Sequence, residues 1–214
     1  MSQFTVQIEG TIGCGKSTFL ERFREQENFT VLEEPVEKWK NFKGHNLLDL
    51  AYKFGDKYRA SFQLYTMKTL LENHNIQVKG IKVMERSFHS GNYVFKELLN
   101  ECKNLKVETQ ILDEWYEFLE RNNSKMLTPN LVVYLRTDPQ IALNRTKERN
   151  RSEESTIYLN FIQKVHDLHE KWLRNDRNNL NYEIYEIDAN KNKEELSSEF
   201  EKLLAYKKEK ANKN

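Results

Sequence analysis

Two hydrophobic patterns alternate along the chain. Short runs rich in β-branched and aromatic residues are separated by longer stretches in which apolar residues recur at helical spacing. The short runs predict strands at Phe4–Glu9, Phe29–Glu33, Ile81–Met84, Leu131–Leu135 and Tyr182–Ile187. The longer stretches predict helices at Lys16–Gln26, Asp56–Asn73, Tyr93–Leu99, Glu108–Asn122, Pro139–Glu148, Ile157–Arg174 and Lys193–Lys207. This alternation is typical of an α/β fold, so we predict a five-stranded parallel sheet with helices on both faces. Such sheets bind ligands beyond the carboxyl ends of their strands.

The composition suits one compact domain. The chain has 214 residues, of which 38% are hydrophobic, and it has only 7 Gly and 3 Pro, which leaves little sequence for a flexible linker. We expect a single domain over residues 1–205 and a solvated Lys/Asn-rich tail at 206–214. The formal net charge of +1 argues against a nucleic-acid-coating surface, which needs a basic excess. Small anionic ligands need only a local cluster of cations.

The cysteines and the N-terminal residues bear on the compartment. Cys14 and Cys102 are too few for a disulfide framework and lack zinc-finger spacing, so we expect reduced thiols. No basic or apolar leader precedes the first predicted strand, and no apolar run approaches the length of a membrane span. We therefore expect a cytosolic protein without a membrane partner. A targeting peptide that had already been removed would leave no trace.

The segment after the first predicted strand has the pattern of a phosphate-binding loop, G-x-x-x-x-G-K-[ST]. Its glycines let the backbone fold around phosphate oxygens, Lys16 supplies charge to the β- and γ-phosphates, and the Ser17 hydroxyl can bind Mg²⁺. The alternative is a glycine-rich turn that merely precedes Lys and Ser. The strand before it and the helix after it favour the phosphate site. The predicted ATP-binding residues are Gly10, Thr11, Ile12, Gly13, Cys14, Gly15, Lys16, Ser17 and Thr18.

Carboxylates follow the second and third predicted strands. Pro35 keeps Glu34 extended at the edge of the sheet, where its carboxylate can accept a proton from an attacking hydroxyl. Glu85 is placed to hold Mg²⁺ through water, and the Arg86 guanidinium can bridge a carboxylate and a phosphate oxygen. A solvated acid at position 34 and a surface salt bridge at 85–86 are the alternative interpretations.

A cluster of arginines follows the fourth predicted strand. Arg145, Arg149 and Arg151 lie in a strongly charged run that ends at Glu154. Such runs are usually solvated helix faces. Phosphoryl transfer, however, needs cations over the γ-phosphate that arrive after the nucleotide binds. We therefore also consider this run a mobile lid that supplies catalytic arginines.

Together these segments resemble the deoxynucleoside kinase family, which includes the insect multisubstrate enzyme, mitochondrial thymidine kinase and deoxycytidine kinase. The resemblance runs from about residue 4 to about residue 190. Its most specific parts are Glu-Pro-Val-Glu-Lys-Trp and Arg-x-Arg-Ser-Glu-Glu. The matching segments are Gly10–Thr18, Glu34–Trp39, Asn46–Leu48, Phe62-Gln63, Glu85–Ser87, Arg149–Glu154 and His166–Leu173.

The resemblance implies roles for individual residues. Glu34 would be the general base on the sugar 5′-hydroxyl, held with that hydroxyl by Arg86. Tyr52 and Glu154 would bind the 3′-hydroxyl, and Gln63 would hydrogen-bond the base edge. The base would be enclosed by three aromatic side chains, which without the family would be interpreted as core packing: Trp39, Phe62 and Phe95.

The resemblance also bears on the choice of base. Purine-accepting relatives place an Arg and an Asp beside the base, and the corresponding residues here, Leu70 and Gly91, are uncharged, with Thr66 beside them. We therefore predict a pyrimidine preference, with the Gln63 amide turning over to suit thymine or cytosine and Gly91 leaving extra room. Position 91 departs from the family pattern, as do Thr11 and Cys14 in the loop. A homodimer is implied by the family alone.

Two other functions share the phosphate loop. A nucleoside monophosphate kinase would need cations around the phosphate of its acceptor, whereas Glu34 would repel that phosphate. For such an enzyme, thymidine monophosphate would be a better acceptor than thymidine. A catalytically silent nucleotide-binding subunit could lose Lys16, Glu34 and the lid arginines without penalty, yet all are present. The interpretation that accounts for all these residues is direct transfer of the γ-phosphate of Mg·ATP to a deoxynucleoside.

Overall fold

The computed structural model describes residues 3–192, 195–196 and 198–203. Its strands are β1 (Phe4–Glu9), β2 (Phe29–Leu32), β3 (Ile81–Glu85), β4 (Leu131–Arg136) and β5 (Glu183–Asp188). All four pairings are parallel, and the strand order is β2-β3-β1-β4-β5. The predicted five-stranded parallel sheet is therefore confirmed, and each strand begins or ends within one residue of its predicted bounds.

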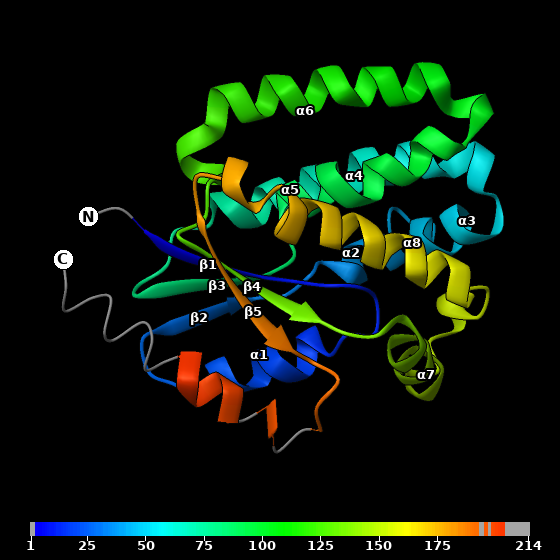
Figure 1. The fold of residues 1–214 in the computed structure, drawn as a ribbon. Helices are drawn as coiled ribbons and strands as arrows, with labels where there is room; N and C mark the ends of the chain where they lie inside the picture. The colour runs from blue at the N-terminus through cyan, green and yellow to red at the C-terminus, as the bar shows by residue number, and fades with distance from the viewer. Residues whose placement is uncertain (1–2, 193–194, 197, 204–214) are drawn as a thin grey trace.

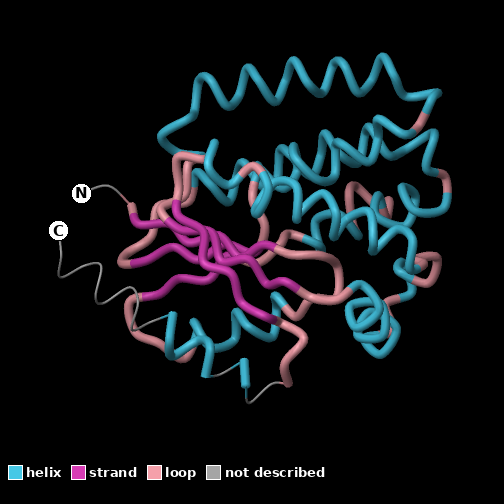
Figure 2. Tube along the Cα trace, viewed as in Figure 1, coloured by secondary structure: helices cyan, strands magenta, loops and turns pink. Residues whose placement is uncertain are grey.

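Helices cover both faces of this sheet. They are α1 (Lys16–Arg24), α2 (Val36–Lys40), α3 (Leu47–Lys53), α4 (Gly55–Asn75), α5 (Phe88–Ser90), α6 (Lys106–Leu127), α7 (Pro139–Arg149) and α8 (Leu159–Glu170). In Figure 1, α1 lies below the sheet, whereas α4, α5 and α8 lie above it, with α6 outermost. Figure 2 shows the strands as one twisted layer between these two groups of helices. None of the helices in the described part of the chain has the length and apolar composition needed to cross a membrane.

The period-two pattern of the strands divides the core between the two faces. On β4, Leu131, Val133 and Leu135 pack with the α1 side, whereas Val132 and Tyr134 pack with the α8 side. Side chains alternate along a strand, so a strand that is buried on both faces must be apolar at successive positions. The continuous apolar run of β4 is therefore explained by its central place in the sheet.

The helix predictions were correct for the long elements and wrong for one short one. The segment predicted as a helix at Tyr93–Leu99 instead follows α5 as a π-helix at Gly91–Lys96 and a 3₁₀-helix at Glu97–Glu101. A second π-helix, Lys171–Asn175, continues α8. Helices α2 and α3 were not predicted, because segments of five and seven residues are too short to show helical periodicity.

The last predicted helix, 193–207, is helical where it is described, at 195–196 and 198–203. The predicted tail at 206–214 lies outside the described residues. The described residues also contain three further 3₁₀ turns: Lys103–Leu105, Ser152–Glu154 and Arg177–Asn179.

Candidate active site

The phosphate-binding loop joins β1 to the N-terminus of α1. Gly13 and Gly15 have positive φ angles of 78° and 98°, which L side chains rarely adopt. A Cβ atom at Gly13 would also collide with the carbonyl oxygen of Ala142 and with Thr146 Oγ1 on α7. The glycine at 13 therefore allows the loop to pack directly against α7, while the loop delivers the positive end of α1 to the site.

Lys16 and Ser17 lie at the start of α1. Lys16 is buried, and its Nζ donates to the carbonyl oxygens of Gly10 (3.3 Å) and Thr11 (3.0 Å). The Ser17 hydroxyl donates to Glu85 Oε1 at 3.2 Å, so the loop serine and the acid at the end of β3 meet as the sequence suggested. A hydroxyl and a carboxylate are hard oxygen ligands that suit Mg²⁺. These two residues thus fit a magnesium site that nucleotide phosphates would complete.

Glu34 and Arg86 form the next part of the site. Arg86 Nε lies 2.8 Å from Glu34 Oε1, and Arg86 Nη1 donates to the Gly10 carbonyl oxygen at 3.3 Å. The Arg86 guanidinium also lies over the Phe95 ring, 4.6 Å from its centroid. Arg86 has a positive φ of 63°, a strained conformation for a non-glycine residue that is common at functional sites. Burial raises the pKa of Glu34, and the Arg86 charge lowers it in part.

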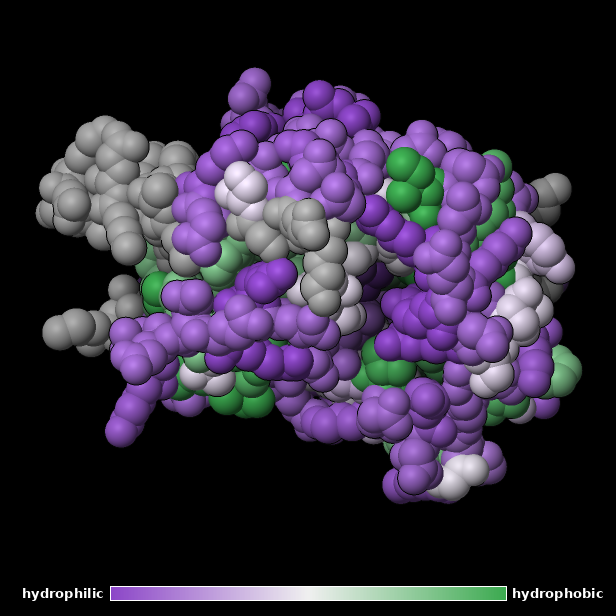
Figure 3. Space-filling view, turned by 90° about the horizontal axis from the view of Figure 1, so that it is seen from below, coloured by the Kyte–Doolittle hydropathy of each residue, from purple (hydrophilic) through white to green (hydrophobic). Residues whose placement is uncertain are grey.

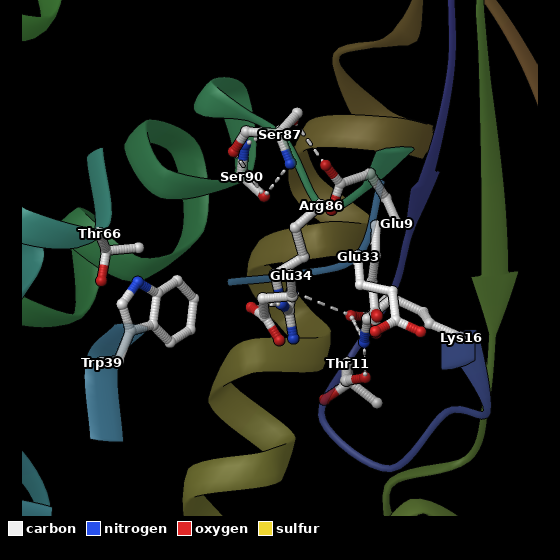
Figure 4. A network of polar contacts seen from close by, with 12 residues as sticks. Glu9, Thr11, Lys16, Glu33, Glu34, Trp39, Thr66, Arg86, Ser87 and Ser90 are labelled. Carbon is white, nitrogen blue, oxygen red and sulfur yellow. Dashed lines mark hydrogen bonds and ion pairs between the residues drawn. The ribbon is translucent and has the colours of Figure 1, made fainter. Parts of the chain in front are cut away.

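Behind Arg86 lies a buried acid that sequence reasoning missed. Glu9, the last residue of β1, is 0% exposed, and its Oε1 accepts a hydrogen bond from Ser87 Oγ at 2.6 Å. In Figure 4 the Glu9 carboxylate points toward Ser87, whereas the Arg86 guanidinium points toward Glu34. Burial raises the pKa of Glu9 to about 7, although Arg86 and Ser87 oppose the shift. Its only sequence signal is its place directly before the loop.

The three aromatic side chains that were predicted to enclose the base, Trp39, Phe62 and Phe95, line one cavity. Trp39 and Phe62 meet edge to face, with ring centroids 5.5 Å apart, and Trp39 Nε1 donates to Thr69 Oγ1 at 2.8 Å. Thr66 and Leu70 lie on α4 beside Gln63 and line the same cavity. The Thr66 hydroxyl is buried and has no hydrogen-bond partner within the protein. A base between Trp39 and Phe62 would therefore meet aromatic walls, with the Thr66 hydroxyl available beside them.

The contacts of Gln63 and the position of Gly91 differ from the sequence-based prediction. Gln63 Nε2 donates to the Gly91 carbonyl oxygen and to the Tyr116 hydroxyl, both at 2.8 Å. Gly91 does not line the cavity, and a Cβ placed there would lie 2.6 Å from the Tyr116 hydroxyl. The extra room predicted at Gly91 is thus already filled by Tyr116. Nothing in the local sequence signals this contact, because Tyr116 follows Gln63 by 53 residues.

The lid arginines divide into two groups. Arg149 Nη2 contacts both carboxylate oxygens of Glu154 at 2.8 and 2.6 Å, and Arg151 Nη1 contacts Glu154 Oε1 at 3.4 Å. Arg145 instead donates to the carbonyl oxygens of Ala189 (2.8 Å) and Lys191 (3.1 Å) and does not line the cavity. The structure therefore brings Arg149 and Arg151 to the site and leaves Arg145 out of it. Arg145 lies near the middle of α7, where its side chain faces the loop after β5.

A contact between Asn46 and Glu153 fastens the lid. Asn46 Nδ2 donates to Glu153 Oε1 at 3.1 Å, while Asn46 Oδ1 caps α3 by accepting from the Asp49 backbone N–H at 3.0 Å. The adjacent Glu154 lies near Tyr52, whose pKa is raised by burial and then by the Glu154 charge, so the Tyr52 phenol stays a hydrogen-bond donor. Asn46 and Glu153 belong to segments that carry the family resemblance, but no role was predicted for either of them.

One cavity of about 560 Å³ joins these parts. It brings together most of the predicted site residues and leaves out Arg145, Gly91 and five members of the loop. The predicted residues that line it are Ile12, Gly13, Lys16, Ser17, Glu34, Trp39, Tyr52, Phe62, Gln63, Thr66, Leu70, Glu85, Arg86, Phe95, Arg149, Arg151 and Glu154.

Comparison with known proteins agrees with this geometry. Residues 6–210 match the family described as deoxynucleoside kinase. Mitochondrial thymidine kinase 2 from Homo sapiens is 40% identical over 168 residues, which cover 78% of this chain and 63% of that protein; the Macaca fascicularis protein gives the same coverage and identity. Deoxycytidine kinase from Homo sapiens is 29% identical over 236 residues, covering 95% of this chain and 89% of that protein. The match thus spans less than two thirds of the thymidine kinase 2 proteins. With the P-loop, the parallel sheet and the family match in agreement, the chain belongs to the deoxynucleoside kinase family.

Proposed function

We propose that this protein transfers the γ-phosphate of ATP to the 5′-hydroxyl of a deoxynucleoside. The observation that carries the proposal is the single cavity that runs from Lys16 and Ser17 to the Trp39–Phe62 walls. The Glu34–Arg86 pair lies between these two ends (Figure 4). A hydroxyl beside Glu34 would then face both a base and a phosphate donor.

The residues suggest direct in-line transfer. Glu34 would take the hydroxyl proton, and its raised pKa makes it a stronger base than an ordinary carboxylate. Arg86 would hold the ionised Glu34 in place, while Lys16, Arg149 and Arg151 would balance charge on the transferred group. Mg²⁺ held by Ser17 and Glu85 would supply further positive charge to the phosphate oxygens. Since Glu34 acts on the substrate hydroxyl itself, no phospho-enzyme is needed.

A pyrimidine nucleoside is the substrate we favour. Thr66 and Leu70 line the base end of the cavity without charge, so neither offers a charged side chain to pair with the polar edge of a second ring. Thymidine kinase 2 is 40% identical to the chain, whereas deoxyguanosine kinase from Xenopus laevis is 28% identical. We therefore expect thymidine and deoxycytidine to be phosphorylated faster than deoxyadenosine and deoxyguanosine.

The test is transfer of labelled γ-phosphate from Mg·ATP to each of the four deoxynucleosides at one low concentration. A pyrimidine lead of about tenfold, or about 1.4 kcal/mol in transition-state binding, is expected. A purine lead would overturn the assignment of the base pocket alone. Better transfer to thymidine monophosphate than to thymidine would instead indicate a monophosphate kinase. ATP binding without transfer to any acceptor would indicate a silent nucleotide-binding subunit.

Glu34→Gln tests the assignment of the base. The amide keeps the size of the side chain but cannot accept the hydroxyl proton, so turnover should fall by about 10²–10⁴-fold. The affinity for ATP should stay within about twofold of the wild-type value, because Lys16 and the loop are unchanged. Turnover comparable to that of the wild type would refute the role of Glu34.

We also propose that the protein is a homodimer that packs through α4 and α6. Four α6 residues and Leu64 of α4 are large apolar side chains with exposed fractions between 46% and 65%, and the α6 members recur at helical spacing. They are Leu64, Val107, Ile111, Trp115 and Phe118. The opposite face of the molecule, seen in Figure 3, is mostly hydrophilic. A second copy would cover this patch with its own, as a two-fold interface requires.

Light scattering during size-exclusion chromatography tests this dimer. The wild type should have twice the mass of the chain, and Trp115→Glu should have the mass of one chain with an unchanged circular dichroism spectrum. A wild-type monomer would refute the proposal. The matched control is Glu117→Gln, which lies on the same helix outside the patch.

A further inference from the structure

The chain leaves the sheet sharply after β3, at Arg86. The Arg86 N–H donates to the Ile8 carbonyl oxygen at 3.1 Å, which continues the pairing of β3 with β1, and the φ of Arg86 is 63°. A left-handed backbone costs free energy at a residue with a side chain, so it persists only where neighbouring contacts hold it. The contacts that hold this turn therefore also determine where the Arg86 guanidinium points.

Ser87, the residue after Arg86, supplies such contacts. It caps α5: its Oγ accepts from the Ser90 N–H at 3.2 Å, and its own N–H donates to Ser90 Oγ at 3.1 Å. A serine hydroxyl has one hydrogen, and the Ser87 hydroxyl donates it to Glu9 Oε1 at 2.6 Å. The side chains of Glu9, Ser87 and Ser90 are fully buried. Glu9, at the end of β1, thus fastens the turn after Arg86 to the sheet (Figure 4).

The segment that Glu9 fastens carries two parts of the active site. It begins with Arg86, whose Nε lies 2.8 Å from Glu34 Oε1, and it continues through α5 into the π-helix Gly91–Lys96. Phe95 belongs to that π-helix, and its ring centroid lies 4.6 Å from Arg86 Cζ. A shift of this segment would therefore move both the guanidinium and the ring that supports it relative to Glu34.

The residue after Glu9 contacts the same guanidinium. The Gly10 carbonyl oxygen accepts from Arg86 Nη1 at 3.3 Å and from Lys16 Nζ at 3.3 Å. Glu9 and Gly10 thus hold Arg86 at two points, at its backbone turn through Ser87 and at its guanidinium directly. The end of β1 therefore links the phosphate-binding loop to the orientation of Arg86.

We propose that Glu9 is a positioning residue for phosphoryl transfer: through Ser87 it holds the left-handed turn at Arg86 and so keeps the guanidinium aligned with Glu34. This inference rests on the proposed nucleoside kinase function. Glu9 acts on Ser87 as a hydrogen-bond acceptor, so the role needs an oxygen at Oε1 and does not need a negative charge. Glu9 does not line the substrate cavity, so it acts on the reaction through Arg86.

Steady-state kinetics of two substitutions at position 9 test this role. The Met side chain of Glu9→Met is similar in size to Glu but offers Ser87 no oxygen, so kcat for thymidine should fall about 10–100-fold. Glu9→Gln keeps Oε1, so its kcat should stay within about twofold of the wild-type value. The KM for ATP should stay within about twofold in both variants, because Lys16 and the loop are unchanged. Equal losses in the two variants, or wild-type kinetics in Glu9→Met, would overturn the proposal.

A second buried position on β1 separates positioning from a general loss of packing. Gln7 lies two residues before Glu9 and thus on the same face of the strand; it is fully buried, and its Nε2 donates to the Leu127 carbonyl oxygen at 3.4 Å. Gln7→Met removes this buried polar contact, so Tm should fall while kcat stays within about twofold. A loss of kcat as large as that of Glu9→Met would show that position 9 matters only for packing.

Double-mutant cycles test the route of the effect. In an Arg86→Ala background, Glu9→Met should lower the remaining kcat by less than about twofold, because the group that Glu9 positions is absent. Ser87→Ala removes the intervening hydroxyl, so it should lower kcat as much as Glu9→Met, and the two together should add less than about twofold. Additive losses in either cycle would contradict the proposed route.

The same assays distinguish this role from the proposed function. A wild type that transfers labelled γ-phosphate from Mg·ATP to thymidine, with additive losses in the cycles, would overturn the positioning role alone. A wild type that phosphorylates no nucleoside would overturn the proposed function and this role with it.

Discussion

Replacing Glu9 with glutamine should change how the stability of the protein depends on pH. Glu9 is 0% exposed, its Oε1 accepts from Ser87, and its Oε2 is buried without a hydrogen-bond partner in the protein. Burial disfavours the charged form, so the pKa rises from 4.5 to about 7. Glutamine keeps the oxygen that accepts from Ser87 and never ionises.

The sign follows from proton linkage. Between pH 4.5 and about 7 the folded protein keeps the Glu9 proton that the unfolded chain has released, so the free energy of unfolding falls as pH rises. The contribution of the neutral carboxyl is fully present below pH 4.5 and is lost above about pH 7. The shift multiplied by 1.36 kcal/mol per pH unit gives about 3 kcal/mol. For a chain of this length that corresponds to roughly 6–12 °C in Tm.

Urea unfolding of both proteins at pH 5, 6, 7 and 8 measures the effect. The difference in unfolding free energy, Glu9→Gln minus wild type, should rise by about 2–3 kcal/mol from pH 5 to pH 8. A pH-independent cost of the amide would shift this difference equally at every pH and would not change the rise. Other titrating groups are common to both proteins and cancel in the difference. Glu21→Gln, at an exposed position of α1, is the control and should give a flat difference. A flat difference for Glu9→Gln as well would refute the reasoning.

Two further predictions concern the loop and the lid. Gly13→Ala should weaken ATP binding by about tenfold or more, measured by titration calorimetry, because its φ is 78° and its Cβ would collide with α7. Gly44→Ala, at a φ of 86° with open space around it, should cost only about 1 kcal/mol of stability and leave ATP binding unchanged. Asn46→Asp keeps the side-chain cap of α3 but places a carboxylate against the Glu153 carboxylate. The KM for nucleoside should therefore rise about 3–10-fold, while Tm stays within about 3 °C of the wild-type value. An unchanged KM would show that Asn46 does not fasten the lid.

The parts of this molecule that the sequence predicts are those decided locally. Strand β4 is apolar at each of its first five positions because both faces are covered, and such a run is recognisable without knowing what covers it. The Asp138 side chain caps helix α7 by accepting from the Gln140 N–H, and Pro139 occupies the first turn of the helix. Both signals are visible in the sequence. The phosphate loop is predicted for the same reason, since its glycines meet requirements of the loop backbone itself.

The parts that were missed depend on contacts between distant segments. The π-helix at Gly91–Lys96 has apolar residues spaced much as in an α-helix, so periodicity cannot separate the two. Tyr116 reaches Gln63 across 53 residues, and its pattern indicates only a buried helix position. Arg145 shares the composition of the lid, but its partners are carbonyl oxygens after β5 that no local pattern identifies.

The buried acids around Arg86 show how the sheet sets the chemistry of the site. The parallel strands bring Glu9, at the end of β1, and Glu34, just beyond β2, to the same edge of the sheet. There both carboxyl groups interact electrostatically with the Arg86 guanidinium. The positive charge of Arg86 lowers the pKa of each against the effect of burial. Burial keeps Glu9 protonated up to about pH 7, so below that pH the positive charge of Arg86 is available to Glu34. Glu9→Gln, whose side chain is neutral at every pH, should therefore leave the kcat/KM profile for thymidine unchanged below pH 7. A displaced acid limb would show that Glu9 and Glu34 titrate as a coupled pair.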